Sequence, residues 1–191
     1  MHPTQRLIEE HQTILRAMGV LERIAEAYGE DPGGTLDDAR AMVEFLRGFA
    51  EELHHAKEEA FLFPAMEEAG HSRHAGPIGV MLMEHDDGRG LIAEMLNAFE
   101  DPAAGADTFE AAALSFAEMI RNHILKEDEI LFPLAEETLS DHVRARLVER
   151  MAHHDEVLHG KEYQRQLAVL AELALEYPVA RSTDGRPASP T

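Results

Sequence analysis

"HHAKEEAFLFPAMEE", residues 54–68, places two imidazoles and two carboxylates in one helical stretch, ahead of an apolar run and a proline. "NHILKEDEILFPLAEE", residues 122–137, repeats this pattern 69 residues later. Both copies contain Leu-Phe-Pro, and the alignment pairs four further positions: His54 with His123, Lys57 with Lys126, Glu58 with Glu127, and Glu59 with Asp128. A match of this length indicates an internal duplication of one helix.

The spacing of histidine and glutamate is the same in the two copies. Four residues separate His54 from Glu58, and four separate His123 from Glu127. Side chains at positions i and i+4 lie on one face of a helix, one turn apart. Each pair can therefore point at a single place in the core.

Two more histidines lie in segments that precede these copies. "IEEHQTIL" contains Glu10-His11, and "LMEHDDGRGLI" contains Glu84-His85. Apolar residues stand at helical spacing from both histidines, so we expect the two imidazoles to face the core. The chain therefore reads as two helix pairs, each with one histidine followed by His-x-x-x-Glu, related by a pseudo-twofold axis.

Four imidazoles and two carboxylates in a core suggest a metal centre, because buried carboxylates without partners are very costly. Histidine and carboxylate without sulfur suit iron or manganese, and also zinc. Glu58 and Glu127 as bridges, with two histidines for each metal, give a symmetric dinuclear centre. Each metal would keep open positions for a small ligand, unlike a closed tetrahedral site. The open positions favour iron, with manganese or zinc possible.

Neighbouring residues receive supporting roles. Three polar ones are expected to face outward or to lie behind the ligands: His55, which has Ile124 opposite it, Glu59 and Asp128. The nearby phenylalanines are expected in the core: Phe61, Phe63 and Phe132. Pro64 and Pro133 remove a backbone donor, so we expect a helix kink about two turns past the metal.

Apolar residues recur at helical spacing along the chain, and strand signals are nearly missing. Helices are predicted at about residues 4–28, 35–69, 78–99, 108–137 and 140–177, the last hinging near Gly160. The predicted fold is all-α, an antiparallel up-down four-helix bundle over residues 4–137 within a domain of residues 1–177. The fifth helix packs outside the bundle, caps one end or mediates dimerisation. The polar, Pro-rich residues 178–191 are expected to be disordered.

Composition limits the classes of function. The 191 residues are 45% hydrophobic, enough to bury one core, and a formal net charge of -20 disfavours nucleic acid as a partner. Cysteine is absent, which excludes thiolate catalysis and Cys-ligated clusters, whereas histidine is abundant. No apolar run approaches the length of about 18 residues that spans a membrane, and no signal peptide is visible. A cytoplasmic location fits this pattern, and the oligomeric state is unknown.

"HHAKEEAFLFP" and "HILKEDEILFP", preceded by His11 and His85, resemble the hemerythrin-like HHE cation-binding domains. The resemblance implies a four-helix bundle around a non-heme di-iron centre, bridged by two carboxylates and an oxo or hydroxo group. It implies these ligands: His11, His54, Glu58, His85, His123 and Glu127. Arg89 stands where the oxygen-carrying hemerythrins of invertebrates have a second histidine on the third helix. The doubled His-x-x-x-Glu pattern is closer to bacterial hemerythrin-like proteins, whose roles vary.

The predicted fifth helix offers a further histidine ligand. Related bacterial sequences have a histidine near the position of His159, which makes His159 a candidate metal ligand. His154, on an apolar stripe with Leu147 and Met151, is the alternative. Either histidine is otherwise a surface residue or one behind the ligands. Arg89 is either a solvated charge or a donor to a bridging carboxylate.

A centre enclosed between helices admits only small molecules. The first hypothesis is therefore a di-iron protein that binds or senses O2 or NO. One alternative is a di-iron enzyme acting on peroxide, NO or O2, with Glu59 or Asp128 as a proton source. Another is iron storage, or iron delivery for the repair of iron clusters. A metal-free structural bundle is the last alternative, and the sequence identifies no catalytic residue.

Overall fold

The computed structural model describes residues 2–158 and 160–179, and these residues form helices and no strand, as the all-α prediction requires. Most segments are α-helical, and four are π-helical. In chain order they are α1 (Pro3–Glu30), α2 (Pro32–Phe45), η1 (Leu46–His55), η2 (Glu58–Leu62), α3 (Phe63–Glu68), α4 (Gly76–Ala98), α5 (Pro102–Lys126), η3 (Glu127–Leu131), α6 (Phe132–Thr138), α7 (Asp141–His153), η4 (His154–Leu158) and α8 (Gly160–Glu176).

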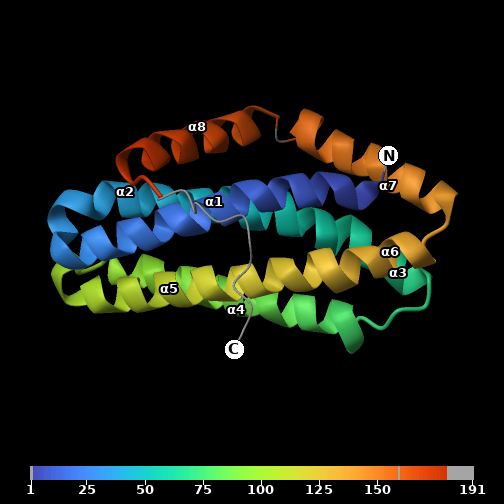
Figure 1. Cartoon of the computed structure of the whole chain (residues 1–191), viewed down its shortest axis with the longest axis horizontal. Coiled ribbons are helices and arrows are strands. Elements are labelled where there is room, and N and C mark those ends of the chain that lie inside the picture. Colours follow the sequence, from blue (N-terminus) through green and yellow to red (C-terminus); the bar gives the residue numbers. More distant parts are fainter. Residues whose placement is uncertain (1, 159, 180–191) are drawn as a thin grey trace, which may run out of the picture.

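Four antiparallel rods make the bundle (Figure 1). The rods are α1, then α2 continued through η1, η2 and α3, then α4, and finally α5 continued through η3 and α6. The predicted fifth helix is divided into α7 and α8, and α8 begins at Gly160, where a hinge was expected. Both segments lie on the side of α1 and α2 that faces away from α4 and α5 (Figure 1). Of the predicted tail, Pro178 and Val179 lack regular structure, and the rest is outside the described residues.

Two helices begin earlier than the sequence predicted. α2 starts at Pro32 rather than near Thr35, and α5 starts at Pro102 rather than at Thr108. In both cases an aspartate before the proline caps the helix, its carboxylate accepting a hydrogen bond from a backbone N–H three residues later. A proline at the first helical position has no N–H of its own, so one of the donors that would lack a partner in the first turn is absent. The Asp-Pro pairs therefore begin helices in segments that had been interpreted as loops.

The turns η2 and η3 are π-helical and directly precede the two Leu-Phe-Pro prolines. The Phe63 N–H donates to the carbonyl of Glu58, five residues earlier, and the Phe132 N–H donates to that of Glu127. Such wide turns are frequent at functional sites. A π-helical turn therefore begins at each glutamate, and in the second rod η1 is π-helical before it, from Leu46 to His55. The helix kink expected about two turns past the metal stays a prediction.

Two apolar clusters fill the bundle, one on each side of a layer of buried histidines and glutamates. The larger cluster includes Ile14 of α1 and Ile92 of α4, and the smaller one includes Leu7 and Met81 of the same helices. His11 stands between Leu7 and Ile14 on α1. The polar layer is thus enclosed by hydrocarbon at both ends.

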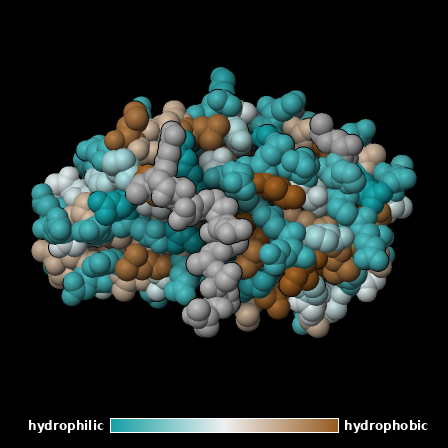
Figure 2. Space-filling view, in the orientation of Figure 1, coloured by the Kyte–Doolittle hydropathy of each residue, from teal (hydrophilic) through white to brown (hydrophobic). Residues whose placement is uncertain are grey.

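Hydrophilic residues predominate on the face drawn in Figure 2, and hydrophobic ones form small separate patches. The most exposed large apolar side chains of the described residues include Leu175 of α8 and Met83 of α4. None of the helices in residues 2–158 and 160–179 combines the length and apolar character needed to cross a membrane.

Candidate metal centre

Six side chains predicted as ligands meet in the polar layer, and each is at most 1% exposed. They are His11, His54, Glu58, His85, His123 and Glu127. Their ligand atoms form two groups that share Glu58, and within each group the atoms lie within 4.8 Å of one another. The first group is His11, His54, Glu58 and Glu127, and the second is His55, Glu58, His85 and His123.

Several of these atoms have no hydrogen-bond partner among the described residues. They are both carboxylate oxygens of Glu58 and of Glu127, and Nε2 of His85 and of His123. In the first group, Nε2 of His11 and Nε2 of His54 face each other at 3.1 Å. Buried polar atoms without partners are rare and costly. A cation held by their lone pairs would satisfy them, so these residues fit a metal.

Each glutamate faces histidines of both groups. Glu58 places one oxygen 3.8 Å from Nε2 of His54 and the other 3.4 Å from Nε2 of His85. Glu127 places one oxygen 3.1 Å from Nε2 of His11 and the other 3.2 Å from Nε2 of His123. The two carboxylates thus span the space between the groups, as bridging ligands would.

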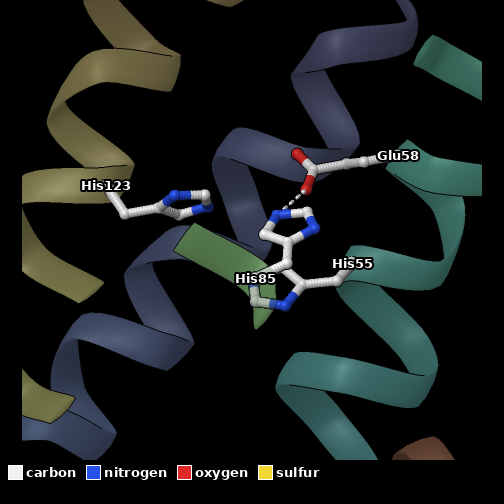
Figure 3. A group of neighbouring side chains, drawn as sticks. All are labelled: His55, Glu58, His85 and His123. Carbon is white, nitrogen blue, oxygen red and sulfur yellow. Dashed lines mark ion pairs between the residues drawn. The ribbon is translucent and has the colours of Figure 1, made fainter. Parts of the chain in front are cut away.

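His55 requires a correction, because it was expected to face outward or to lie behind the ligands. It is 2% exposed and belongs to the second group, where its ring lies beside that of His85 (Figure 3). Its ring stacks on that of His85, with the centroids 3.9 Å apart, and its Nδ1 lies 2.9 Å from a carboxylate oxygen of Glu51. The second group therefore contains three imidazoles, and the first contains two.

The position of η1 at a corner of the bundle explains why two consecutive histidines both point inward. His54 faces α1, where its Nδ1 meets Glu10, whereas His55 faces His85 of α4 and His123 of α5. The residue opposite His55 in the repeat, Ile124, is buried in the larger apolar cluster instead. The adjacent histidines were the signal in the sequence. The alignment concealed it, because Ile124 stands opposite His55 and this difference favoured a place for His55 outside the ligand set.

A carboxylate lies behind each of the four predicted histidine ligands in the polar layer and contacts its Nδ1. The pairs are His11 with Asp128 at 2.8 Å, His54 with Glu10 at 2.9 Å, His85 with Glu59 at 2.7 Å, and His123 with Glu84 at 3.0 Å. Such a partner fixes the ring and leaves Nε2 for the metal. Glu59 and Asp128 thus lie behind the ligands, which is one of the two positions expected for them. Glu10 and Glu84 were not predicted, although each directly precedes a core-facing histidine in the sequence.

Three cations lie behind these carboxylates. Lys57 contacts Glu10, and Lys126 contacts Glu84. Arg89 contacts Glu59 and also donates to Glu51, at 2.9 Å, and its side chain is 42% exposed. Arg89 therefore acts on carboxylates behind the ligands, and its guanidinium does not reach the bridging carboxylates that the sequence suggested.

The charges of the metal-free centre are set by its own groups. Burial lowers the pKa of His85 and of His123, but the facing carboxylates outweigh it and raise the pKa to about 9 and about 10. Burial and the neighbouring imidazoles hold the pKa of His55 well below its usual value. Burial raises the pKa of Glu127, but His123 and His11 outweigh it and lower that pKa. Metal binding must therefore displace protons, because only neutral imidazole is a ligand.

The two histidine candidates of the C-terminal segment have different outcomes. His159 lies outside the described residues. His154 is buried, and its ring makes an edge contact with Phe61 at 5.7 Å. Within the described part of the chain, neither group of potential ligands includes His154.

Comparison with known proteins identifies the family of the chain. The sequence model of the hemerythrin family, described as the hemerythrin HHE cation binding domain, matches residues 2–135. An uncharacterized protein of Mycobacterium tuberculosis is 28% identical over 145 residues, which cover 68% of this chain and 54% of that protein. The iron-sulfur cluster repair protein YtfE of an Enterobacter species is 35% identical over 104 residues, which cover 50% of this chain and 47% of that protein.

The YtfE protein of Cronobacter sakazakii is similar as well. It is 31% identical over 121 residues, which cover 59% of this chain and 53% of that protein. The chain therefore spans about half the length of the curated relatives that it matches. No solved structure matches the chain.

Proposed function

Because the chain belongs to the hemerythrin HHE cation-binding domain family, we propose that it is a non-heme di-iron protein that binds or senses O2 or NO. Each of the two groups would hold one iron, with Glu58 and Glu127 between them. Imidazole and carboxylate without sulfur suit iron, and manganese or zinc would compete for the same atoms. Bound iron would supply a redox-active centre with coordination positions open to a diatomic molecule.

One observation carries this proposal: each glutamate places its two oxygens toward histidines of different groups. A single closed site would need neither two groups nor two such carboxylates. The oxygens are buried and lack hydrogen-bond partners among the described residues. Two cations held between the histidines account for the positions of Glu58 and Glu127 together.

The aromatic side chains around the centre favour a ligand of only a few atoms. Phe132 stacks on His11, with centroids 5.4 Å apart, and Phe63 stacks on His85 at 5.9 Å. Both phenylalanines are buried and come from the two Leu-Phe-Pro motifs. These rings exclude water from one end of the polar layer and leave little room for a substrate larger than a few atoms.

A second candidate function is iron delivery for the repair of iron–sulfur clusters. The specific observation is the similarity to two proteins named for that repair, over about half of their length. In this function the same centre would hold iron as cargo. The alternative of a peroxide- or NO-consuming enzyme has no comparable observation in its favour.

Metal content and an optical spectrum test the di-iron centre. We expect close to two irons per chain in protein purified without chelators, with charge-transfer bands in the oxidised form. Glu58→Gln should reduce iron content and abolish the bands, whereas Glu68→Gln, at an exposed position of α3, should leave both unchanged. A wild-type chain that binds one iron or none would contradict the proposal.

Two further measurements separate the candidate functions. A ferrous sample that forms a stable or reversible spectral adduct with O2 or NO supports binding or sensing. Loss of iron from that sample to an apo-protein acceptor of iron–sulfur clusters, faster than to buffer alone, supports delivery. A protein that retains its iron and forms no adduct would exclude both.

A further inference from the structure

A line of charged side chains connects the ligand His54 to the C-terminal helical segment. Nδ1 of His54 lies 2.9 Å from Glu10, and Glu10 also contacts Lys57. Nζ of Lys57 donates to Oδ1 of Asp155 at 2.8 Å, and Oδ2 of Asp155 accepts from Nε of Arg6 at 3.0 Å. Asp155 lies in η4, 98 residues from Lys57 and outside the residues that the family model matches.

The equivalent line on the other side of the centre is shorter. Nδ1 of His123 contacts Glu84, which contacts Lys126, in the same order as His54, Glu10 and Lys57. The side chain of Lys126 is 36% exposed, whereas that of Lys57 is 0% exposed. Asp155 thus provides a second carboxylate where the repeat alone would leave a lysine facing solvent.

Burial makes the second carboxylate important. A lysine ammonium taken fully out of water needs several acceptors, because an unpaired buried charge is strongly unfavourable. Glu10 and Asp155 both contact Nζ of Lys57. Without Asp155, Lys57 would have to satisfy its charge through Glu10 alone or turn toward solvent, and either change would move the carboxylate that holds His54.

Asp155 is itself fixed from the outer side. Arg6 and Asp155 line a hollow of about 280 Å³ between α1 and α7, together with apolar residues that include Met151. Arg6 also lies 3.3 Å from Glu10 and places its guanidinium 5.0 Å from the centre of the Tyr163 ring on α8. The carboxylate of Asp155 therefore stands where solvent meets the charged line.

We propose that Asp155 is a positioning residue for the metal held by His11 and His54, acting through Lys57 and Glu10. This inference rests on the proposed dinuclear centre. It assigns the C-terminal segment a role in metal retention: η4 fixes the orientation of one ligand imidazole. On the side of His85 and His123 the outer contacts come from the bundle itself, through Glu59, Arg89 and Glu51.

Asp155→Asn should leave the segment in place, because other contacts fix it to the bundle. The Tyr177 hydroxyl donates to Asp38 at 2.7 Å, and the amide of Gln166 packs against the backbone at Gly48. Leu170 and Leu173 of α8 are part of the larger apolar cluster. The variant therefore changes the charged line and retains the packing.

The test is the release of Co²⁺ from protein loaded with two ions per chain, followed optically after excess chelator is added. We expect Asp155→Asn to release one of the two ions about tenfold faster, the lower end of the effect of a residue behind a ligand. Asp155→Glu should restore slower release. Unchanged release in Asp155→Asn would overturn the inference.

A double-mutant cycle separates this role from simple packing. In a Lys57→Met background, Asp155→Asn should have no further effect on release, because the residue through which it acts is gone. In the matched Lys126→Met background its full effect should persist. An equal effect in both backgrounds would overturn the route through Lys57. Wild-type protein that binds fewer than two Co²⁺ ions would overturn the dinuclear centre itself, and this inference with it.

Discussion

His54 and His123 occupy equivalent places in the repeat, yet their surroundings differ. Each contacts a glutamate through Nδ1, and each glutamate contacts a lysine. On the α1 side, which holds His11 and His54, Asp155 of η4 also contacts the lysine, and this lysine, Lys57, is buried. On the α4 side, which holds His85 and His123, the corresponding Lys126 is partly exposed.

The difference shows that a duplicated motif determines contacts and does not determine burial. Burial depends on what packs outside the bundle, and α7, η4 and α8 cover only the side of α1 and α2 (Figure 1). The second difference is His55, which adds an imidazole to the group on the α4 side, whereas Ile124 lies in the apolar cluster. One side thus has the buried outer charges, and the other has the additional imidazole.

The largest effect is expected from removing Glu58, the carboxylate that the two groups share. Glu58→Ala deletes both oxygens that face His54 and His85, so the metal content should fall from about two ions per chain to one or none. Elemental analysis of protein loaded with iron and passed through a desalting column measures this. Glu68→Ala, on the surface of α3, is the control. Retention of two ions by Glu58→Ala would mean that the sides are independent sites.

The second prediction compares the two lysines in metal-free protein. Lys57→Met removes the buried cation that Glu10 and Asp155 share and leaves the two carboxylates with Arg6, whose side chain is 40% exposed. Removing one partner of a buried ion pair typically costs about 3–5 kcal/mol. Lys126→Met removes a partly exposed pair with Glu84, which is worth roughly 0–1 kcal/mol. Denaturant unfolding in the presence of chelator measures both. Equal losses would contradict the difference in burial between the sides.

His55→Ile makes the α4 side chemically like the α1 side, because Ile124 is the repeat equivalent. If His55 is a ligand, one of the two ions should bind at least about tenfold more weakly, as even residues behind ligands change affinity by that factor. Competition with a chelator of known affinity measures the binding of each ion. His153→Ala, at an exposed position, is the control. Unchanged affinity for both ions would leave His55 as a structural neighbour.

Much of this arrangement could be predicted from the sequence. The spacing of His54 and Glu58, repeated at His123 and Glu127, indicated which face of each helix points inward, because helical periodicity is local. The same periodicity placed His11 in the core. The helical fold class followed from the same apolar spacing, and the structure bears it out.

The rest depends on neighbours that are distant in sequence. The role of His55 follows from the corner position of η1, which only the packing of four rods reveals. The burial of Lys57 requires Asp155, 98 residues away. The early starts of α2 and α5 were predictable in principle, since an Asp-Pro pair caps a helix, but the glycines that follow each proline suggested loops.

The histidines of the second group should make the stability of the metal-free protein depend on pH. His85 and His123, both of the second group, have pKa values raised to about 9 and about 10, above the unfolded value of about 6.5. A raised pKa contributes stability that is fully present below about pH 6.5 and is lost as pH rises through 9 to 10. The free energy of unfolding should therefore fall between pH 8 and pH 10.

His123→Asn is the variant that isolates this contribution. It removes the group with the higher of the two pKa values, so its unfolding free energy should depend less on pH over the same interval. Urea unfolding at a series of pH values, with chelator present, measures both proteins. An identical slope in the two proteins would show that other groups cause the dependence.

The smallest expected effect lies at the exposed edge of the α4 side. Arg89 pairs with Glu59 and Glu51, which hold His85 and His55. Its side chain is 42% exposed, so water can replace it, and Arg89→Gln should destabilise the protein by less than about 1 kcal/mol. Arg89→Gln should also change the rate of Co²⁺ release less than Asp155→Asn does. Both residues act on a ligand histidine only indirectly, Arg89 through Glu59 and Asp155 through Lys57 and Glu10. A larger effect of Arg89→Gln would mean that the number of outer contacts, rather than their burial, decides how firmly each imidazole is held.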